Sequence, residues 1–208
     1  MRPKRPEKHT LLRLVLDNMS LVFQYGSNCS SSRLNLPERL GGAAITRGVA
    51  QTIAEYDIAF NVWSQKNGCA ASDLIPASGT GHRVWGVVYD IPVDRLRGRR
   101  TDEANTLAQI EGQRYEEKTV KVVMRENEEL DAVTFVVKPN ERRSGLWTSA
   151  DYVGHIVKGL RAGGAPEEYV QHVIEVAIET NHCASACSDE QVDLIAALAG
   201  ASHDSEHL

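Results

Sequence analysis

The feature that most constrains the fold is the segment VWGVVYDI at residues 84–91, which is nearly continuous in residues that favour β-strands. A run of this kind is typical of a strand that is buried on both faces, and Pro92 ends it. Residues 56–62 instead alternate large apolar side chains with polar or small ones, which is the pattern of a half-buried strand. We therefore predict one fully buried strand and one half-buried strand.

The other elements divide the chain into a strand-rich first part and a helix-rich last third. Further strands are predicted at residues 20–24, 119–124 and 132–137, with a Gly-, Ser-, Asn- and Ala-rich loop at 64–83. Helices are predicted at residues 102–111, from a cap formed by Thr148 and Asp151 through Leu160, from Pro166 to about Glu179, and at 189–199 behind Ser188 and Gln191. This order predicts an α+β fold, in which a small mixed β-barrel or sheet is flanked by helices.

The expected domain organisation is one core with appendages. We expect residues 1–18 to form a disordered basic tail, residues 19–180 a single domain, and residues 181–208 a C-terminal helical extension. The sequence contains no internal repeat and no low-complexity segment.

Charge and hydropathy exclude several classes of partner. The net charge of −5 is unsuited to binding polyphosphate, so no nucleic-acid partner is expected. The basic residues near the N-terminus and at positions 95–100 are most simply solvated. No apolar run approaches the length of a membrane span, and residues 11–16 are too short for a secretory signal and are broken by Arg13. Four cysteines form no dense disulfide pattern, so a reducing cytoplasm is the expected location.

The first candidate site is the turn YGSN at residues 25–28, which follows an apolar strand. Gly26 and its small neighbours would let a ligand approach main-chain N–H groups, and a helical turn from Ser30 would favour an anion such as a carboxylate. The simpler alternative is a strand-to-helix connection in which Ser27 or Asn28 caps the helix. The segment lacks the glycine and lysine spacing of a phosphate-binding loop.

The second candidate is Glu111, at the end of a short predicted helix and directly before Gly112. A carboxylate there lies at the unfavourable end of the helix dipole. Apolar surroundings would raise its pKa towards the working range of a general base. The alternative is an exposed glutamate in a turn. Tyr115 is either a core residue or a hydroxyl directed at the same place.

A metal site is a weaker candidate. His182, Cys183 and Cys187 are residue types that suit zinc, but no fourth ligand is evident and adjacent residues point in different directions on a helix. The sequence contains no nucleophile elbow, and His82, His155 and His172 have no visible partner.

The order of these motifs resembles the γ-glutamylcyclotransferase-like family. The resemblance rests on the YGSN turn, the VWGVVY strand and a glutamate followed by glycine, and it covers roughly residues 20–178. It implies a small mixed β-barrel with one pocket, in which Tyr25, Gly26, Ser27, Asn28 and Tyr115 bind a γ-glutamyl small molecule. It also implies that Glu111 takes a proton from the substrate's α-ammonium group. The freed amine then attacks the γ-carbonyl, and 5-oxoproline and the free amine or amino acid are released, with no cofactor and no metal. A homodimer is a further expectation at the level of the family.

The chain also departs from the family pattern. Tyr115 follows Glu111 more closely than in some members, Phe135 stands where certain members carry a tyrosine, and Cys29 replaces a larger apolar residue. Two alternatives therefore stay open: a binding protein with the same fold that no longer turns over, and an enzyme that removes a γ-glutamyl group from a biosynthetic intermediate. The leaving group is expected to be selected by loops such as 64–83 and 92–103, where the arginines at 95–100 could contact an acidic group.

Overall fold

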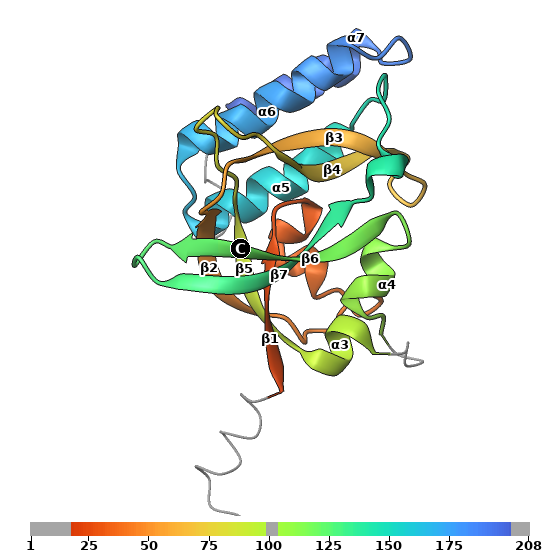
Figure 1. The fold of residues 1–208 in the computed structure, drawn as a ribbon. Helices are drawn as coiled ribbons and strands as arrows, with labels where there is room; N and C mark the ends of the chain where they lie inside the picture. The colour runs from red at the N-terminus through yellow and green to blue at the C-terminus, as the bar shows by residue number, and fades with distance from the viewer. Residues whose placement is uncertain (1–17, 99–103, 201–208) are drawn as a thin grey trace, which may run out of the picture.

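The strands form a closed mixed barrel (Figure 1). The computed structural model describes residues 18–98 and 104–200; the predicted basic tail and residues 99–103 and 201–208 lie outside this part of the chain. The barrel has the order β1-β5-β2-β6-β7 and is built from β1 (Met19–Gln24), β2 (Ile45–Thr52), β5 (Trp85–Pro92), β6 (Tyr115–Met124) and β7 (Glu129–Val137). Neighbouring strands are antiparallel except β1 and β7, whose parallel pairing of Val22 with Val133 closes the barrel. The predicted α+β class with a small mixed barrel is confirmed.

Strand β5 is buried on both faces, as its composition predicts. Val87, Val88, Tyr89 and Ile91 are all almost completely buried. Gly86 provides the space for this packing, because a Cβ atom there would lie 2.7 Å from the ring of Phe23 on β1 and 2.4 Å from the Gln24 carbonyl oxygen.

A separate two-stranded sheet lies beside the barrel. It consists of β3 (Tyr56–Ser64) and β4 (Cys69–Pro76). Burial of Ile58, Phe60 and Val62 confirms the half-buried character predicted for β3. The prediction of a loop over 64–83 was wrong for β4, and β2 was not predicted. The small residues that resemble a loop in sequence are buried in β4, and β2 is interrupted by a register shift between Thr46 and Gly48.

Three helices follow the barrel strands and cover the same side of it as the hairpin (Figure 1). They are α5 (Ala150–Gly163), α6 (Glu167–His182) and α7 (Asp189–Ala196), the last continuing into a 3₁₀ turn at Ala197–Ala199. Helix α6 contacts both α5 and β3. Ile195 of α7 is completely buried, and α6 runs through residue 180, where the predicted domain boundary lies.

One predicted cap was wrong, and a second is correct in position only. Helix α5 is capped by Ser149, whose hydroxyl accepts a hydrogen bond from the Tyr152 amide, while the hydroxyl of Thr148 donates to the carbonyl oxygen of Ala70. Ser188 stands at the cap position of α7 but its side chain makes no capping hydrogen bond.

Several short helical segments connect these elements. They are the 3₁₀ turns Ser27–Cys29 and Pro139–Glu141, α2 (Ser31–Leu34), α3 (Val93–Arg97) and α4 (Leu107–Glu111). Helix α4 begins later than the predicted residue 102, because Thr106 and Gln109 form a capping box at its start. Within residues 18–98 and 104–200, no helix combines the length and apolar character that a bilayer span requires.

Candidate active site

The YGSN turn needs glycine for space and not for backbone torsion. Gly26 has φ −97° and ψ −155°, an extended conformation open to other residues. A Cβ atom at this position would lie 2.3 Å from the Ser72 hydroxyl oxygen and 3.4 Å from the Tyr152 hydroxyl oxygen. The turn is therefore pressed directly against β4 and α5.

The residues after Gly26 line the pocket and do not cap a helix. Ser27 and Asn28 lie in a 3₁₀ turn, and the cap of α2 is Ser30, whose hydroxyl accepts a hydrogen bond from the Arg33 amide at 3.3 Å. The alternative in which Ser27 or Asn28 caps the helix is therefore wrong. Both side chains face the cavity.

Ser72 connects the tyrosines around this turn. Its amide and its hydroxyl group each lie 3.1 Å from the Tyr152 hydroxyl oxygen, and its carbonyl oxygen accepts a hydrogen bond of 2.8 Å from the Tyr115 hydroxyl. Tyr25 donates to the carbonyl oxygen of Phe135 at 2.6 Å. Burial raises the pKa of all three tyrosines, so they act as neutral hydrogen-bonding groups. Sequence reasoning missed Ser72, because it lies in the segment that resembles a loop.

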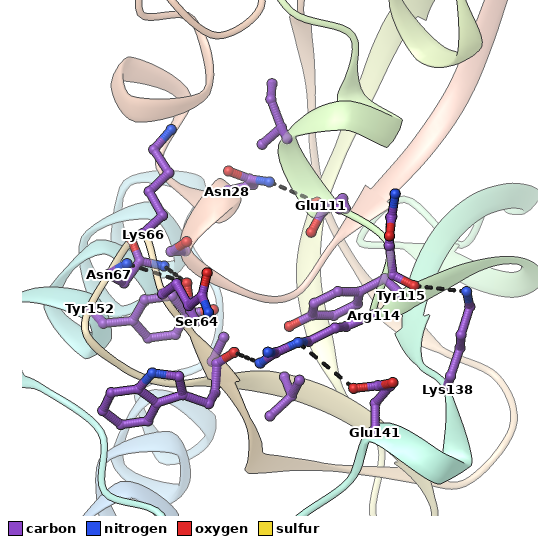
Figure 2. A pocket seen from close by; sticks show the side chains of 18 of the residues that line it. Asn28, Ser64, Lys66, Asn67, Glu111, Arg114, Tyr115, Lys138, Glu141 and Tyr152 are labelled. Carbon is purple, nitrogen blue, oxygen red and sulfur yellow. Dashed lines mark hydrogen bonds and ion pairs between the residues drawn. The ribbon is translucent and has the colours of Figure 1, made fainter.

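Glu111 is joined to the YGSN turn by a hydrogen bond. The Asn28 side-chain amide donates to its Oε1 atom at 2.8 Å, and Figure 2 shows this bond between the two neighbouring side chains. The side-chain Oδ1 atom of Asn28 in turn accepts a hydrogen bond from the guanidinium of Arg39, a buried residue that sequence reasoning also missed. Gly112, with φ 83°, ends α4 directly after the carboxylate.

The environment of Glu111 gives its carboxyl group the pKa of a base that works near neutrality. Burial raises its pKa from 4.5 to about 7, against the opposing effects of the Arg39 charge and of hydrogen bonds from Asn28 and Gln24. A group of this kind can both accept and return a proton at neutral pH.

One open pocket of about 800 Å³ is bordered by Asn28, Glu111, Tyr115 and Tyr152, among others. A narrow recess of about 30 Å³ continues from it beneath the turn, between Tyr25, Ser72 and Phe135. Five cationic and two acidic side chains line the pocket: Arg33, Arg39, Lys66, Arg114, Lys138, Glu111 and Glu141. The pocket is thus positively charged although the whole chain carries −5.

Two of these cations lie close together without a carboxylate in salt-bridge contact among the described residues. They are Arg33, which donates to the Asn67 side-chain oxygen at 2.9 Å, and Lys66, whose pKa is lowered by partial burial and by the charges of Arg39 and Arg33. On the opposite wall Arg114 pairs with Glu141 at 3.7 Å (Figure 2). Residues 64–67 also line the pocket. They belong to the segment 64–83 that was expected to select the leaving group.

The other candidates lie elsewhere. Neither Arg95 nor Arg97 lines the pocket, and Arg97 pairs with Glu117, while Arg99 and Arg100 lie outside the described residues. His182, Cys183 and Cys187 do not come together as a metal-ligating group in the described part of the chain. Cys29 is buried and donates to the Gln24 carbonyl oxygen, and burial raises the pKa of its thiol to about 12.

The barrel and the adjoining hairpin match a γ-glutamylcyclotransferase-like fold, and comparison with known proteins agrees. Residues 83–173 match the model of the AIG2-like family. This confirms the resemblance to the γ-glutamylcyclotransferase-like family that the motifs indicate. The matched segment includes Glu111, Tyr115 and Tyr152. No curated protein sequence shows a significant match to the chain.

Solved structures show the same fold at low identity. A protein named gamma-glutamyl cyclotransferase superposes with a TM-score of 0.64 at 24% identity, covering 86% of this chain and 99% of its own. An uncharacterized protein from Homo sapiens gives a TM-score of 0.65 at 24% identity, with the same coverage of both chains. YkqA from Bacillus subtilis gives 0.62 at 20% identity, covering 85% of this chain and 59% of its own.

Proposed function

We propose that this chain is a cofactor-free enzyme that cyclises a γ-glutamyl amine or peptide to 5-oxoproline. The observation that carries the proposal is Glu111, a carboxylate with a pKa of about 7 that is hydrogen-bonded to the YGSN turn in the wall of the pocket. A binding protein would have no need of such a base.

The reaction needs no nucleophile from the protein. Glu111 takes a proton from the substrate's α-ammonium group, whose pKa is about 8, so transfer to a carboxylate with a pKa of about 7 is unfavourable by only about tenfold. The amine nitrogen forms a bond to the γ-carbonyl carbon, and the bond from that carbon to the leaving nitrogen breaks. The attacking nitrogen loses a second proton as the lactam forms. The leaving amine takes up both protons and departs as an ammonium ion, with Glu111 returning to its carboxylate form. A positioned base contributes roughly 10²–10⁴-fold to such a step, and holding the glutamyl chain curled adds to it.

The residues around the base have distinct parts in this proposal. Ser27, Asn28 and Tyr115 line the pocket beside Glu111 and are placed to contact the γ-glutamyl group. Gly26 lets the turn approach β4 closely, and Tyr25 ties the turn to β7 through the Phe135 carbonyl. The hydrogen bonds to Ser72 hold Tyr115 and Tyr152 fixed before the substrate arrives, which is the preorganisation that catalysis needs.

The wall of the pocket that carries Arg33 and Lys66 favours a substrate with an acidic leaving group. Arg33 and Lys66 face the same pocket as Glu111, and neither has a carboxylate in salt-bridge contact among the described residues. A carboxylate or phosphate on the leaving amine would be attracted to them. We therefore propose γ-glutamyl amino acids or peptides as better substrates than uncharged γ-glutamyl alkylamines.

The test is release of 5-oxoproline from a panel of γ-glutamyl amines, amino acids and dipeptides. We expect release by the native protein and a loss of roughly 10²–10⁴-fold in Glu111→Gln. Glu141→Gln is the matched control, because Glu141 lines the same pocket on the wall opposite Arg33 and Lys66. Equal activity of the native protein and Glu111→Gln would contradict the proposal.

Calorimetry on the same samples separates the alternatives. Binding of a γ-glutamyl compound without turnover would favour a binding protein, and turnover restricted to one large γ-glutamyl conjugate would favour removal of the group from a biosynthetic intermediate. The expected homodimer stays a prediction, to be tested by light scattering.

A further inference from the structure

Three residues far apart in the sequence form a cluster outside the pocket. Asp57 lies on β3, His82 in the loop before β5, and His172 on α6. The Nδ1 atom of His82 lies 2.9 Å from Asp57 Oδ2, and the Nε2 atom of His172 lies 2.8 Å from Asp57 Oδ1. The two imidazole rings are 5.5 Å apart between centroids. None of the three residues lines the candidate active site.

The geometry is close to that of a metal site. The three ligand atoms all lie within 4.8 Å of one another. Zinc binds imidazole nitrogen and carboxylate oxygen at about 2.0–2.2 Å, which places tetrahedral ligands about 3.3 Å apart. The nitrogen–oxygen distances here would need to open by only about half an ångström to admit the ion. The side chain of His82 is 53% exposed, so it is not held in place by surrounding core residues.

The charge of the cluster also suits a cation. The Asp57 carboxylate lies within hydrogen-bond distance of both imidazoles, which are metal ligands in their neutral form. Two histidines and one carboxylate are a ligand set found in zinc and other transition-metal sites, with the remaining positions left to water.

The alternative is a hydrogen-bonded cluster that only fastens α6 to β3. In that case the two histidines act as donors to Asp57, and the cluster has no affinity for an ion beyond that of any surface histidine. The two interpretations differ in one measurable property, because only a metal site loses its affinity when a single histidine is removed.

We propose that Asp57, His82 and His172 bind a divalent transition-metal ion, with Zn²⁺ as the preferred probe. The ion would link β3, the loop that leads into β5, and α6. This role is structural and separate from the cyclisation, which passes through Glu111. In the sequence neither histidine has a visible partner, and the tertiary structure brings both of them to Asp57.

The test is calorimetric titration of the full chain with ZnCl₂, with Cys183 and Cys187 replaced by serine in every sample to remove the accessible thiols. We expect one equivalent to bind. His82→Asn and His172→Asn should each weaken binding by at least about tenfold, since even groups that only orient a ligand contribute 10–100-fold. His155→Asn is the matched control, because His155 faces a single carboxylate, Asp151, at 4.0 Å.

Two further measurements keep the test decisive. Addition of Co²⁺ should produce visible absorption bands that disappear in His82→Asn, and Zn²⁺ should raise the melting temperature of the parent but not of that variant. His82 is exposed, so its replacement leaves the core intact even if His172→Asn unfolds. Absence of binding, or binding that survives both substitutions, would overturn the proposal. Glu111→Gln should bind zinc normally, so the outcome is independent of the proposed enzyme activity.

Discussion

The inner end of the pocket and its outer mouth are built differently. At the inner end the hydroxyls of Tyr25, Tyr115 and Tyr152 all bond to the backbone or to Ser72, and the turn that carries Gly26 is pressed against them. At the mouth, charged side chains on loops and short helices surround an open volume. The difference indicates a division of roles: the packed inner end fixes the chemistry, and the mouth can change its specificity without disturbing the core.

Apart from the loss of the base, the largest predicted effect is at the close contact between Gly26 and Ser72. Gly26→Ala should reduce kcat/KM for 5-oxoproline release by about 100-fold, because the new methyl group displaces Ser72 and with it two tyrosines. It should also lower the free energy of unfolding by about 1–3 kcal/mol. Denaturant titration and steady-state kinetics measure both.

A double substitution shows whether the cause is this contact. In a Ser72→Ala background the nearest remaining atom lies 3.4 Å from the new Cβ, so part of the cost of Gly26→Ala should vanish, by about 1 kcal/mol. Strictly additive effects would mean that the turn and β4 are not in contact as described.

The second predicted effect is that replacing Glu111 raises the free energy of unfolding. The pKa of Glu111 is raised from 4.5 to about 7, so between these pH values the folded state binds more protons than the unfolded state, and stability falls as the pH rises. Glu111→Gln avoids this cost. It should therefore be more stable than the native protein at pH 8 by about 1–3 kcal/mol, while the two should be similar at pH 4.

Thermal melts of the native protein and Glu111→Gln between pH 4 and pH 8 measure this difference in stability. Glu141→Gln is the reference for removing a carboxylate from the pocket. A variant that is destabilised at every pH would show that Glu111 serves mainly to hold the structure together.

The third effect is confined to the mouth. Lys66→Ala should raise KM about tenfold for a substrate whose leaving group carries a carboxylate, and leave an uncharged γ-glutamyl alkylamine unaffected, since only the former contacts this wall. Lys121→Ala is the control, because Lys121 pairs with Asp131 away from the pocket. An equal loss for both substrates would place Lys66 in the chemistry and remove the distinction between the two regions.

Local pattern was sufficient to predict much of the fold. Strands β1 and β5 follow from runs of apolar residues and β3 follows from alternation, while α5 extends to Gly163, three residues beyond the predicted Leu160. Strand β4 could not be predicted, because its small residues form a strand only through packing against the rest of the protein. The amide of Ala70, for example, bonds to the carbonyl oxygen of Trp147.

The candidate site was predicted in its parts but not in its connections. Asn28 and Glu111 were both identified, yet they are 83 positions apart and their hydrogen bond depends on the barrel. Arg39 lies in a loop with no pattern that indicates burial. The contacts of Asp57 with His82 and His172 likewise bring together a strand, a loop and a helix that only the tertiary structure places side by side.

The most direct test of the account is the pH dependence of kcat/KM for 5-oxoproline release in the native protein and in Asn28→Ala. The substrate's own ammonium group titrates identically in both, so any difference belongs to the enzyme. We expect activity in the native protein to rise with an apparent pKa near 7. In Asn28→Ala the rise should move to higher pH, because the lost hydrogen bond favours the ionised form of Glu111. A rise at the same pH in both proteins would contradict the assignment of Glu111 as the base.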